Sequence, residues 1–349
     1  MPVFIIYIFL TPRPISEETV LKPRWISSLE TNYTINLEYF PALGAGELLP
    51  FILGDRFGFV ADDGSFAINQ IRSAYISLSD KHWAEYEHLP SSIQVMNPLN
   101  EITLVINEPK GYPLFLDNRI FIVGSEQNSI TALDPDGEEL WTFDFPSPIT
   151  CIDAANGYVL AGTLDGVMIL LDSRGIPVSV PFEPGGSRLS VILGCAISQD
   201  ATRMALISGI DNQRFLLLER TGNIYRVVYH SFLGSGFRRP VHVRFVDNDT
   251  KVVFEREGGL AIYSINSRVS TTISLDGEIV SFDNSGDGRF LFVITSQGPG
   301  EKRLVTIRFP GLVVSQAPFK SDNAFLARRD NMLFMGGDQT MVSFELERR

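Results

Sequence analysis

The chain alternates short apolar runs with short polar turns, and this pattern repeats along most of its length. One repeat consists of an apolar strand, a polar turn, a second strand, another polar turn, a third strand and a Gly- or Asn-containing turn into a fourth. The segment Leu133–Gly137 of one copy aligns with Leu171–Gly175 of the next. Seven copies can be recognised, which lie at residues 56–69, 118–140, 157–178, 203–227, 251–267, 289–309 and 331–346.

Repeats of this kind predict a β-propeller. Units of four short strands that recur roughly every 40 residues are typical of propeller blades. The turns between first and second strands are rich in Asp, Asn and Gly, which tolerate turn geometry. No segment keeps a 3.6-residue apolar period over three turns, so helices are expected to be minor. The sequence therefore predicts an all-β fold: a seven-bladed β-propeller with four-stranded antiparallel blades.

Two segments do not fit the seven copies. The alternating stretch Asn32–Phe40 precedes the first copy and has no partner there, whereas the last copy supplies only three strands. Asn32–Phe40 is therefore expected to form the outermost strand of the last blade, so that an N-terminal strand closes the ring. Residues 82–100 lie in the long interval after the first copy, and we interpret them as an insertion in the first blade.

The N-terminal segment contains a separate apolar run, Val3–Leu10. This run is shorter than the ~20 residues of a membrane span, and no Lys or Arg precedes it. We interpret it as the remnant of a signal peptide or membrane anchor, with a buried edge strand as the alternative. The predicted organisation is a remnant and linker at residues 1–23 and a single propeller domain at residues 24–349.

One segment resembles a known family. Residues 132–141, ALDPDGEELW, resemble the tryptophan-docking repeat of the PQQ-like propellers, which include quinoprotein dehydrogenases and the BamB-type lipoproteins of outer-membrane assembly. The resemblance implies that the Trp packs against the next blade, and the residues that match the repeat are Ala132, Asp134, Gly137 and Trp141. Other copies resemble the turn-and-strand pattern of WD40-like and TolB-type propellers.

Composition and charge argue against several functions. A net charge of -12, without a Lys/Arg stripe interleaved with aromatics, argues against nucleic-acid binding. The chain has only three tryptophans, too few for the docking repeats of a quinoprotein dehydrogenase, so no cofactor is expected. Cys151 and Cys195 lie in apolar stretches and are interpreted as small core residues.

Catalytic and metal-binding motifs are not evident in the sequence. The four histidines form no HExxH pair, and there is neither a GxSxG elbow nor a P-loop. Asp283, Ser285 and Asp287 resemble the start of a calcium loop, but Ile294 stands where a bidentate Glu is expected, so a β-turn is favoured. The protein is therefore expected not to be an enzyme; the alternative is a propeller hydrolase or lactonase with a metal in its channel.

Three arginines on two predicted inter-blade loops form the candidate binding site. Arg188 lies in one Gly-rich loop, and Arg238 and Arg239 lie in the next. Their guanidinium groups suit carboxylate or phosphate partners, although they could instead pair with Asp211 or Glu255. We predict a monomeric, protein-binding or scaffolding propeller of the bacterial cell envelope, with an acidic surface as a candidate partner. The expected location is the periplasm, with or without an inner-membrane anchor; the cytoplasm is the alternative.

Overall fold

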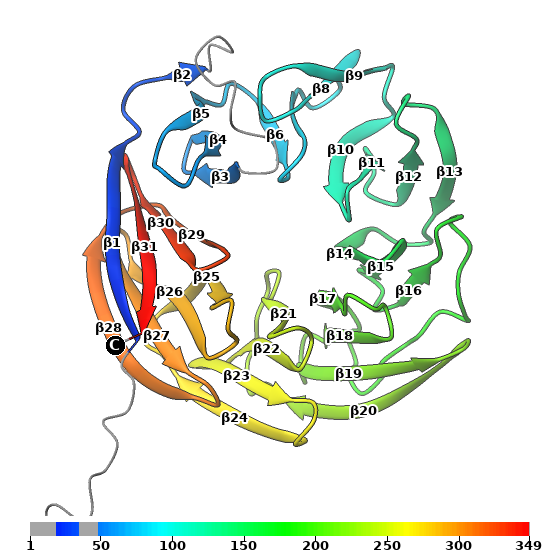
Figure 1. The fold of residues 1–349 in the computed structure, drawn as a ribbon. Coiled ribbons are helices and arrows are strands. Elements are labelled where there is room, and N and C mark those ends of the chain that lie inside the picture. The colour runs from blue at the N-terminus through cyan, green and yellow to red at the C-terminus, as the bar shows by residue number, and fades with distance from the viewer. Residues whose placement is uncertain (1–18, 35–47, 349) are drawn as a thin grey trace, which may run out of the picture.

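The computed structural model describes residues 19–34 and 48–348. Within these residues, 31 strands form eight sheets that are arranged as blades around a central axis (Figure 1). Each blade runs from an inner strand near the axis to an outer strand at the rim, and neighbouring strands in a blade are antiparallel. The described residues include no helix with the length and apolar character needed to cross a membrane.

The strands follow one another around the ring, blade by blade. Blade 1 contains β2 (Tyr33–Thr34), β3 (Leu49–Leu53), β4 (Arg56–Val60) and β5 (Phe66–Ile71), and blade 2 contains β6 (Tyr75–Leu78), β7 (Trp83–Tyr86), β8 (Ser92–Met96) and β9 (Ile102–Asn107). Blade 3 contains β10 (Gly111–Leu116), β11 (Arg119–Gly124), β12 (Ser129–Leu133) and β13 (Glu139–Asp144). Blade 4 contains β14 (Ile149–Ala155), β15 (Tyr158–Thr163) and β16 (Met168–Leu171). Blade 5 contains β17 (Ile192–Ile197), β18 (Arg203–Ser208), β19 (Arg214–Thr221) and β20 (Ile224–Phe232), and blade 6 contains β21 (Val243–Val246), β22 (Lys251–Arg256), β23 (Gly259–Ser264) and β24 (Val269–Ser274). Blade 7 contains β25 (Glu278–Asn284), β26 (Phe290–Gly298), β27 (Glu301–Arg308) and β28 (Leu312–Lys320). Blade 8 contains β29 (Ala324–Arg329), β30 (Met332–Gly337) and β31 (Thr340–Arg348), and β1 (Thr19–Ser28) completes it.

The turns after the inner strands have the geometry that their residues predict. In blades 3 to 8, each of these turns contains at least one residue with positive φ. Gly, Asn and Asp adopt this backbone conformation more readily than other residues. Five of the six residues concerned are of these types, namely Asn118, Asn156, Asp249, Gly288 and Asp330, and the sixth is Ala201.

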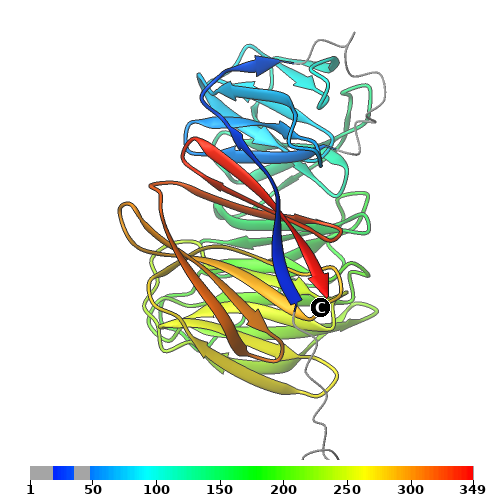
Figure 2. The ribbon, with the colours of Figure 1, turned by 60° about the vertical axis from the view of Figure 1, so that its left-hand side comes forward.

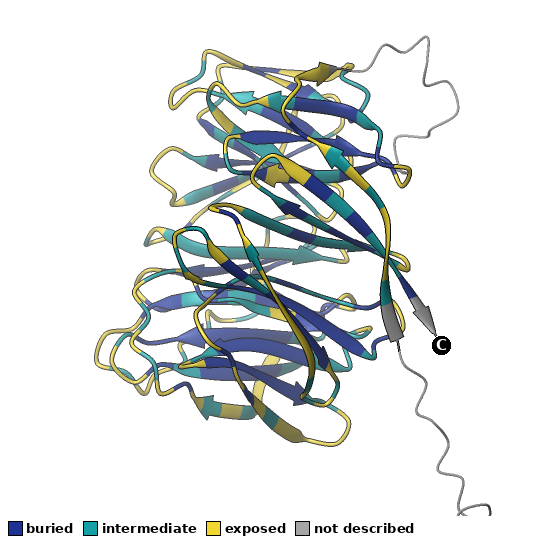
Figure 3. Ribbon diagram, turned by 90° about the vertical axis from the view of Figure 1, so that its left-hand side faces the viewer, coloured by how far each residue is buried: buried dark blue, intermediate teal, exposed yellow. Residues whose placement is uncertain are grey.

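The hydrophobic core is divided among the junctions between blades. The described residues form eight buried clusters, and each cluster is drawn from two adjacent blades. Between blades 5 and 6, for example, the rings of Phe215 and Phe254 stack with their centroids 3.9 Å apart. Buried positions follow the strands, whereas the turns are mostly exposed (Figure 3). Burial of apolar area between blades therefore holds the ring together, since each blade buries one face against each neighbour.

The prediction of seven blades is wrong, because the ring has eight. Residues 82–100, interpreted above as an insertion, belong to a complete blade of four strands, β6–β9. This blade has few buried positions in its first and last strands: β6 has none, and β9 has only Leu104 and Ile106. Its strands are mostly apolar in sequence, but the turn between β8 and β9, residues 97–100, lacks the glycine that the corresponding turns have at Gly137 and Gly175 and by which those copies were aligned.

The prediction of four strands in every blade is also wrong, because blade 4 has three. The segment that follows β16 makes only two isolated bridges to it, Leu171↔Pro177 and Met168↔Phe182. Proline has no N–H to donate to a β-ladder, and this segment contains Pro177 and Pro181. A continuous outer strand is therefore not formed.

An N-terminal strand does close the last blade, but it is not the predicted one. β1 pairs antiparallel with β31, from Thr19↔Arg348 to Ser28↔Thr340, and the two strands lie side by side in Figure 2. Within the predicted segment, Tyr33–Thr34 forms β2 and pairs with β5 in blade 1. Residues 35–40 lie outside the described residues. The N-terminal segment thus supplies outer strands to both blades that flank the closure.

The start of β1 bears on the predicted domain boundary. β1 begins at Thr19, so residues 19–23 are part of the outer strand of blade 8. The apolar run Val3–Leu10, interpreted as a remnant of a signal peptide or anchor, lies outside the described residues.

Candidate functional site

The chain passes from one blade to the next on one face of the ring, called here the crossover face. Four antiparallel strands return the chain to the end at which the inner strand began, so successive connections emerge on the same side. The crossover face carries the loops 72–74, 108–110, 145–148, 183–191, 233–242, 275–277 and 321–323. All three candidate arginines lie on two consecutive loops of this face, 183–191 and 233–242.

Arg239 is held by an acidic residue of blade 6. Its Nη1 and Nη2 atoms lie 3.0 and 2.6 Å from the two carboxylate oxygens of Glu255, and its guanidinium lies 4.8 Å from the ring centroid of Phe237. Only 3% of the Glu255 side chain is exposed. The hydrogen bond with Glu255 raises the pKa of Arg239, which stays charged. Arg239 therefore fastens its loop to β22, which is the alternative role considered for it.

Arg188 and Arg238 are exposed, in contrast to Arg239. Within the described part of the chain, neither side chain forms an ion pair. Asp211, the other acidic residue considered as a partner, binds the loop of Arg188 instead: it accepts hydrogen bonds from the Ser187 hydroxyl and from the Arg188 backbone N–H. The bond from Ser187 lowers the pKa of Asp211 to about 2. The carboxylate thus orders the loop and leaves the guanidinium of Arg188 at the surface.

Loop 233–242 has a second internal support, Gln213. This buried side chain donates from Nε2 to the carbonyl of Phe237 at 2.6 Å, and its Oε1 accepts from the Phe237 N–H at 2.8 Å and from the Ser235 hydroxyl at 2.9 Å. Gln213 could not be recognised from the sequence, because a single Gln directly before the apolar strand β19 is not a distinctive signal. Together with the Arg239–Glu255 pair, it fixes the loop that carries Arg238.

Trp141 lies in β13 at the rim of blade 3 and contacts blade 4. Its indole Nε1 donates a hydrogen bond to the carbonyl of Ser173 at 2.9 Å. The ring lies directly on Gly175, where an added Cβ would be 2.5 Å from an indole carbon. Trp141 is half-buried, so this contact covers part of the indole and not the whole of it.

The other residues of the docking repeat build the turn that leads into β13. Asp134 accepts hydrogen bonds at Oδ1 from the backbone N–H groups of Asp136 and Glu138, both at 2.9 Å. Gly137 has a φ of 88°, which favours glycine. Ala132 is buried in β12, opposite Trp141 in the strand register.

At two more junctions between blades, a large side chain of one blade packs against a glycine in a turn of the next. Gly137 lies against Leu104 of blade 2, and Gly64 of blade 1 lies against the indole of Trp25 in β1. The indole Nε1 of Trp25 donates to the Asp62 carbonyl at 2.6 Å. The same type of contact therefore joins blades 8 and 1, 2 and 3, and 3 and 4. Leu104 was missed in the sequence because leucine takes the position that tryptophan occupies elsewhere.

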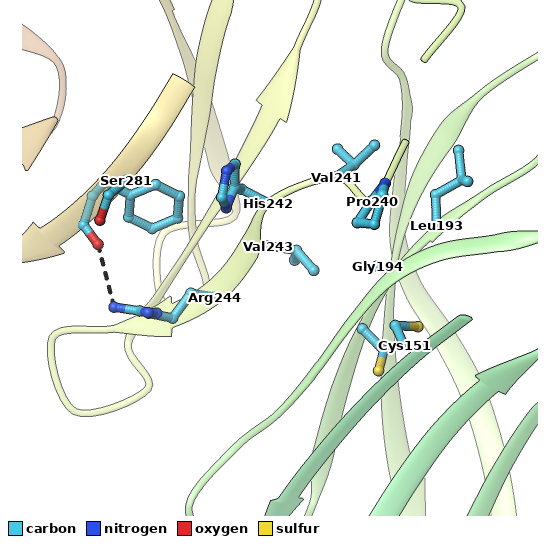
Figure 4. A pocket seen from close by; sticks show the side chains of 11 residues that line it. Cys151, Leu193, Gly194, Pro240, Val241, His242, Val243, Arg244 and Ser281 are labelled. Atoms are coloured by element: carbon cyan, nitrogen blue, oxygen red, sulfur yellow. Dashed lines mark hydrogen bonds between the residues drawn. The ribbon is translucent and has the colours of Figure 1, made fainter. Parts of the chain in front are cut away.

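A pocket of about 230 Å³ lies among the inner strands of blades 4 to 7 (Figure 4). Its lining includes Cys151, Cys195, His242 and Arg244. Arg244 donates from Nη1 to the carbonyl of Phe282 at 3.2 Å. The sequence did not single out this group, since its four members come from three separate blades, 4, 5 and 6.

Two titratable groups of this pocket, Cys195 and His242, favour their uncharged forms. A hydrogen bond with Cys151, together with burial, raises the pKa of Cys195 well above its ordinary value, so the thiol is a poor nucleophile at neutral pH. Both cysteines are half-buried and pack against the cluster between blades 4 and 5. Burial also lowers the pKa of His242, which favours neutral imidazole.

Aspartates near the axis tie neighbouring inner strands together. Asp153 of blade 4 accepts the N–H of Ile197 in blade 5 at 2.9 Å, and burial raises its pKa. Asp283 of blade 7 accepts the N–H of Arg328 in blade 8 at 3.0 Å. These carboxylates are therefore part of the connections between blades.

The DNSGDG segment forms a hydrogen-bonded turn. The Ser285 hydroxyl donates to Asp287 at 2.6 Å and accepts the N–H of Phe290 at 2.9 Å. This agrees with the β-turn that the sequence favours. Across residues 19–34 and 48–348, no group of three or more His, Cys, Asp or Glu residues is placed to hold a metal ion.

Comparison with known proteins identifies the family. A family model described as a β-propeller protein matches residues 1–348. An uncharacterized protein of Treponema pallidum (strain Nichols) is 24% identical over 353 residues, which cover 98% of this chain and 91% of the relative. The crystal structure of BamB from Moraxella catarrhalis aligns with 93% of this chain and 100% of that chain at a TM-score of 0.60 and 14% identity, a likeness of fold alone. Because the family model spans nearly the whole sequence, the chain belongs to this family of β-propeller proteins.

Proposed function

We propose that this propeller is a non-catalytic protein-binding or scaffolding module of the bacterial cell envelope. The partner would contact loops 183–191 and 233–242 of the crossover face, with Arg188 and Arg238 as the charged contacts. The observation that carries the proposal is the contrast within the arginine group: Arg239 is bound to Glu255, whereas the other two are exposed on ordered loops.

The internal support of these loops favours a binding role. Asp211 fastens one loop through Ser187, and Gln213 fastens the other through Phe237. Loops that are already ordered lose less conformational entropy on binding than mobile loops. Two exposed guanidinium groups on such loops suit a partner with carboxylates or phosphates, because arginine offers several donors in a fixed geometry.

The envelope location is part of the same proposal. It rests on the resemblance of residues 132–141 to the PQQ-like repeat, which occurs in envelope proteins of the BamB type. Fractionation of native cells should recover the protein with the periplasm or a membrane. Recovery in the cytoplasmic fraction would contradict this part of the proposal.

The test of the binding site is charge reversal. The double variant Arg188→Glu, Arg238→Glu should lose the partners that chemical cross-linking captures in intact cells, while its free energy of unfolding changes by less than about 1 kcal/mol. The capture by the unmodified protein should also weaken as salt rises, because exposed charges are screened over roughly 8 Å at physiological ionic strength.

A matched control uses two arginines away from the crossover face. Arg226 lies on the outer strand β20, and Arg268 lies in the turn between β23 and β24; both are exposed. The variant Arg226→Glu, Arg268→Glu makes the same change in net charge and should keep the partners. Equal loss in both double variants would show that overall charge, not the proposed site, governs binding.

Stoichiometric calcium or zinc in the purified protein would instead favour the hydrolase or lactonase alternative.

A further inference from the structure

Three tyrosines form a row on the crossover face where blades 2 and 3 meet. The ring of Tyr86 lies between the other two: its centroid is 5.9 Å from that of Tyr75, with an interplanar angle of 26°, and 6.2 Å from that of Tyr112, with an angle of 7°. The row lines a pocket of about 390 Å³, whose remaining lining residues are His88, Ser125 and Gln127.

The strands hold this row in a fixed arrangement. Tyr75 and Tyr86 are opposite each other in the β6–β7 pair, and Tyr112 lies in β10, the inner strand of the next blade. Tyr86 packs with one side against the core cluster between blades 2 and 3. Tyr75 remains 60% exposed. Rigid aromatic side chains that stay accessible provide contact area at a low cost in conformational entropy.

The spacing of the rings suits one type of ligand. A polyproline II helix rises ~3.1 Å per residue and keeps its backbone polar groups available to hydrogen-bond donors. Each step between ring centroids therefore corresponds to roughly two residues of such a helix, and the three rings correspond to a stretch of about four. Grooves lined by aromatic side chains are a recurrent means of binding proline-rich segments, because the ligand is already extended before it binds.

The surroundings of the row are acidic. The adjoining pocket is lined by the carboxylates of Asp55 and Glu87 together with Tyr75, His88 and one cation, Arg72. The carboxylate of Glu85 is already bound to the backbone N–H of Ala74 at 3.0 Å. Two exposed carboxylates against one guanidinium, in a chain with a net charge of -12, favour a ligand with a basic residue next to its apolar part.

We propose that the tyrosine row binds an extended, proline-rich segment of a partner protein, with a basic residue of that segment placed beside Asp55 and Glu87. This site is separate from the arginine loops, which lie at blades 4 to 6, and it does not depend on the role proposed for them. The crossover face would then carry two binding sites. The arginine loops suit an acidic partner, and the tyrosine row suits an apolar segment with a basic residue.

Titration calorimetry with synthetic peptides tests the proposal on the full chain. A short polyproline peptide with one terminal arginine should bind saturably, and the same peptide with glutamate in place of arginine should bind more weakly. Tyr75→Ala should weaken binding by about tenfold or more, since aromatic anchors dominate such interfaces. Because Tyr75 is exposed, its replacement should leave the melting temperature unchanged.

Two further variants sharpen the result. Tyr33→Ala removes a tyrosine of comparable type, 41% exposed, from β2 outside the row and should bind the peptide normally. Glu87→Lys should weaken binding of the arginine peptide and not of an uncharged polyproline. The proposal is overturned if no peptide binds saturably, if Tyr75→Ala binds as well as the unmodified protein, or if an oligosaccharide binds to the row and the peptides do not.

Discussion

Several side chains in this protein join neighbouring blades or fasten a loop to a blade. Arg239 reaches from a crossover loop to Glu255 in β22, and Asp153 reaches from β14 to the backbone of Ile197 in β17. Trp141 reaches from β13 to the turn of the next blade. Several of the charged residues that make the chain acidic therefore have structural partners, and surface charge alone is a poor guide to the binding face.

The Arg239–Glu255 pair allows a direct test at this scale. Arg239→Ala should lower the free energy of unfolding by about 2–4 kcal/mol, because it leaves the buried carboxylate of Glu255 without its cation. Denaturant unfolding monitored by circular dichroism would measure the change. Arg238→Ala, on the exposed neighbouring residue, serves as the control and should change the stability by less than about 0.5 kcal/mol.

If Arg239 instead belongs to the binding site, the two variants should have similar stability. Arg239→Ala would then retain its stability and lose partner binding. The pair of measurements therefore separates the structural role from a binding role for this residue.

Asp211 gives a pH-dependent prediction. The hydrogen bond from Ser187 holds its pKa at about 2, below the ordinary value of 3.8. A carboxylate with a lowered folded-state pKa stabilises the protein above the unfolded-state pKa, and this contribution is lost as the pH falls through the folded-state value. Asp211→Asn should therefore lower the melting temperature between pH 5 and 7 by an amount that shrinks between about pH 4 and pH 2.

Melting curves at a series of pH values would measure this difference. Asp136 is exposed, and Asp136→Asn serves as the control that should show no such dependence. A difference for Asp211→Asn that stays constant down to pH 2 would contradict the proposed ionic contribution of its carboxylate.

The strand that closes the ring is the critical element at the next scale. β1 covers the edge of β31, and its Trp25 also contacts Gly64 in blade 1, so one strand joins blade 8 to blade 1 by two kinds of contact. An uncovered edge strand exposes backbone hydrogen-bonding groups and favours aggregation. Closure by β1 is thus a matter of solubility as well as of stability.

Deletion of Thr19–Ser28 should accordingly lower the melting temperature strongly and produce oligomers. Size-exclusion chromatography and thermal unfolding would measure both effects. Ile26→Lys is a suitable control, because the side chain of Ile26 is 71% exposed and its replacement preserves the strand pairing. A monomeric deletion variant with unchanged melting would show that β1 is not needed for closure.

The whole molecule is a closed chain of eight shared cores. Because every blade buries one face against each neighbour, loss of one junction weakens the packing of the next. We therefore expect the described propeller to unfold as one cooperative unit, because the eight buried clusters are linked through the blades that they share.

Phe254 offers a way to test this cooperativity. Phe254→Ala removes the stack with Phe215 between blades 5 and 6 and should cost about 3–5 kcal/mol. The same shift in midpoint should be seen by far-ultraviolet circular dichroism and by tryptophan fluorescence, which reports on Trp25, Trp83 and Trp141 in blades 8, 2 and 3. Two separate transitions would show that the blades unfold independently.

The candidate sites were predictable from the sequence only in part. Exposed Arg188 and Arg238 could be proposed because Gly-rich loops between apolar runs indicate surface positions. The pairing of Arg239 with Glu255 could not be distinguished from a binding role, because it depends on how a loop of one blade meets a strand of the next. The tyrosine row was not found, since Tyr86 and Tyr112 become neighbours only when blades 2 and 3 pack together.

The all-β character and the repeated turns could be predicted from local sequence, because turn geometry depends on a few consecutive residues such as Asp134 to Gly137. The number of blades and the identity of the closing strand depend on the tertiary structure. β6–β9 are identified as a blade by their pairing with one another, and β1 is identified as the closing strand by its pairing with β31. Strand partners and burial are set by contacts between segments far apart in the chain, which local patterns of hydrophobicity do not encode.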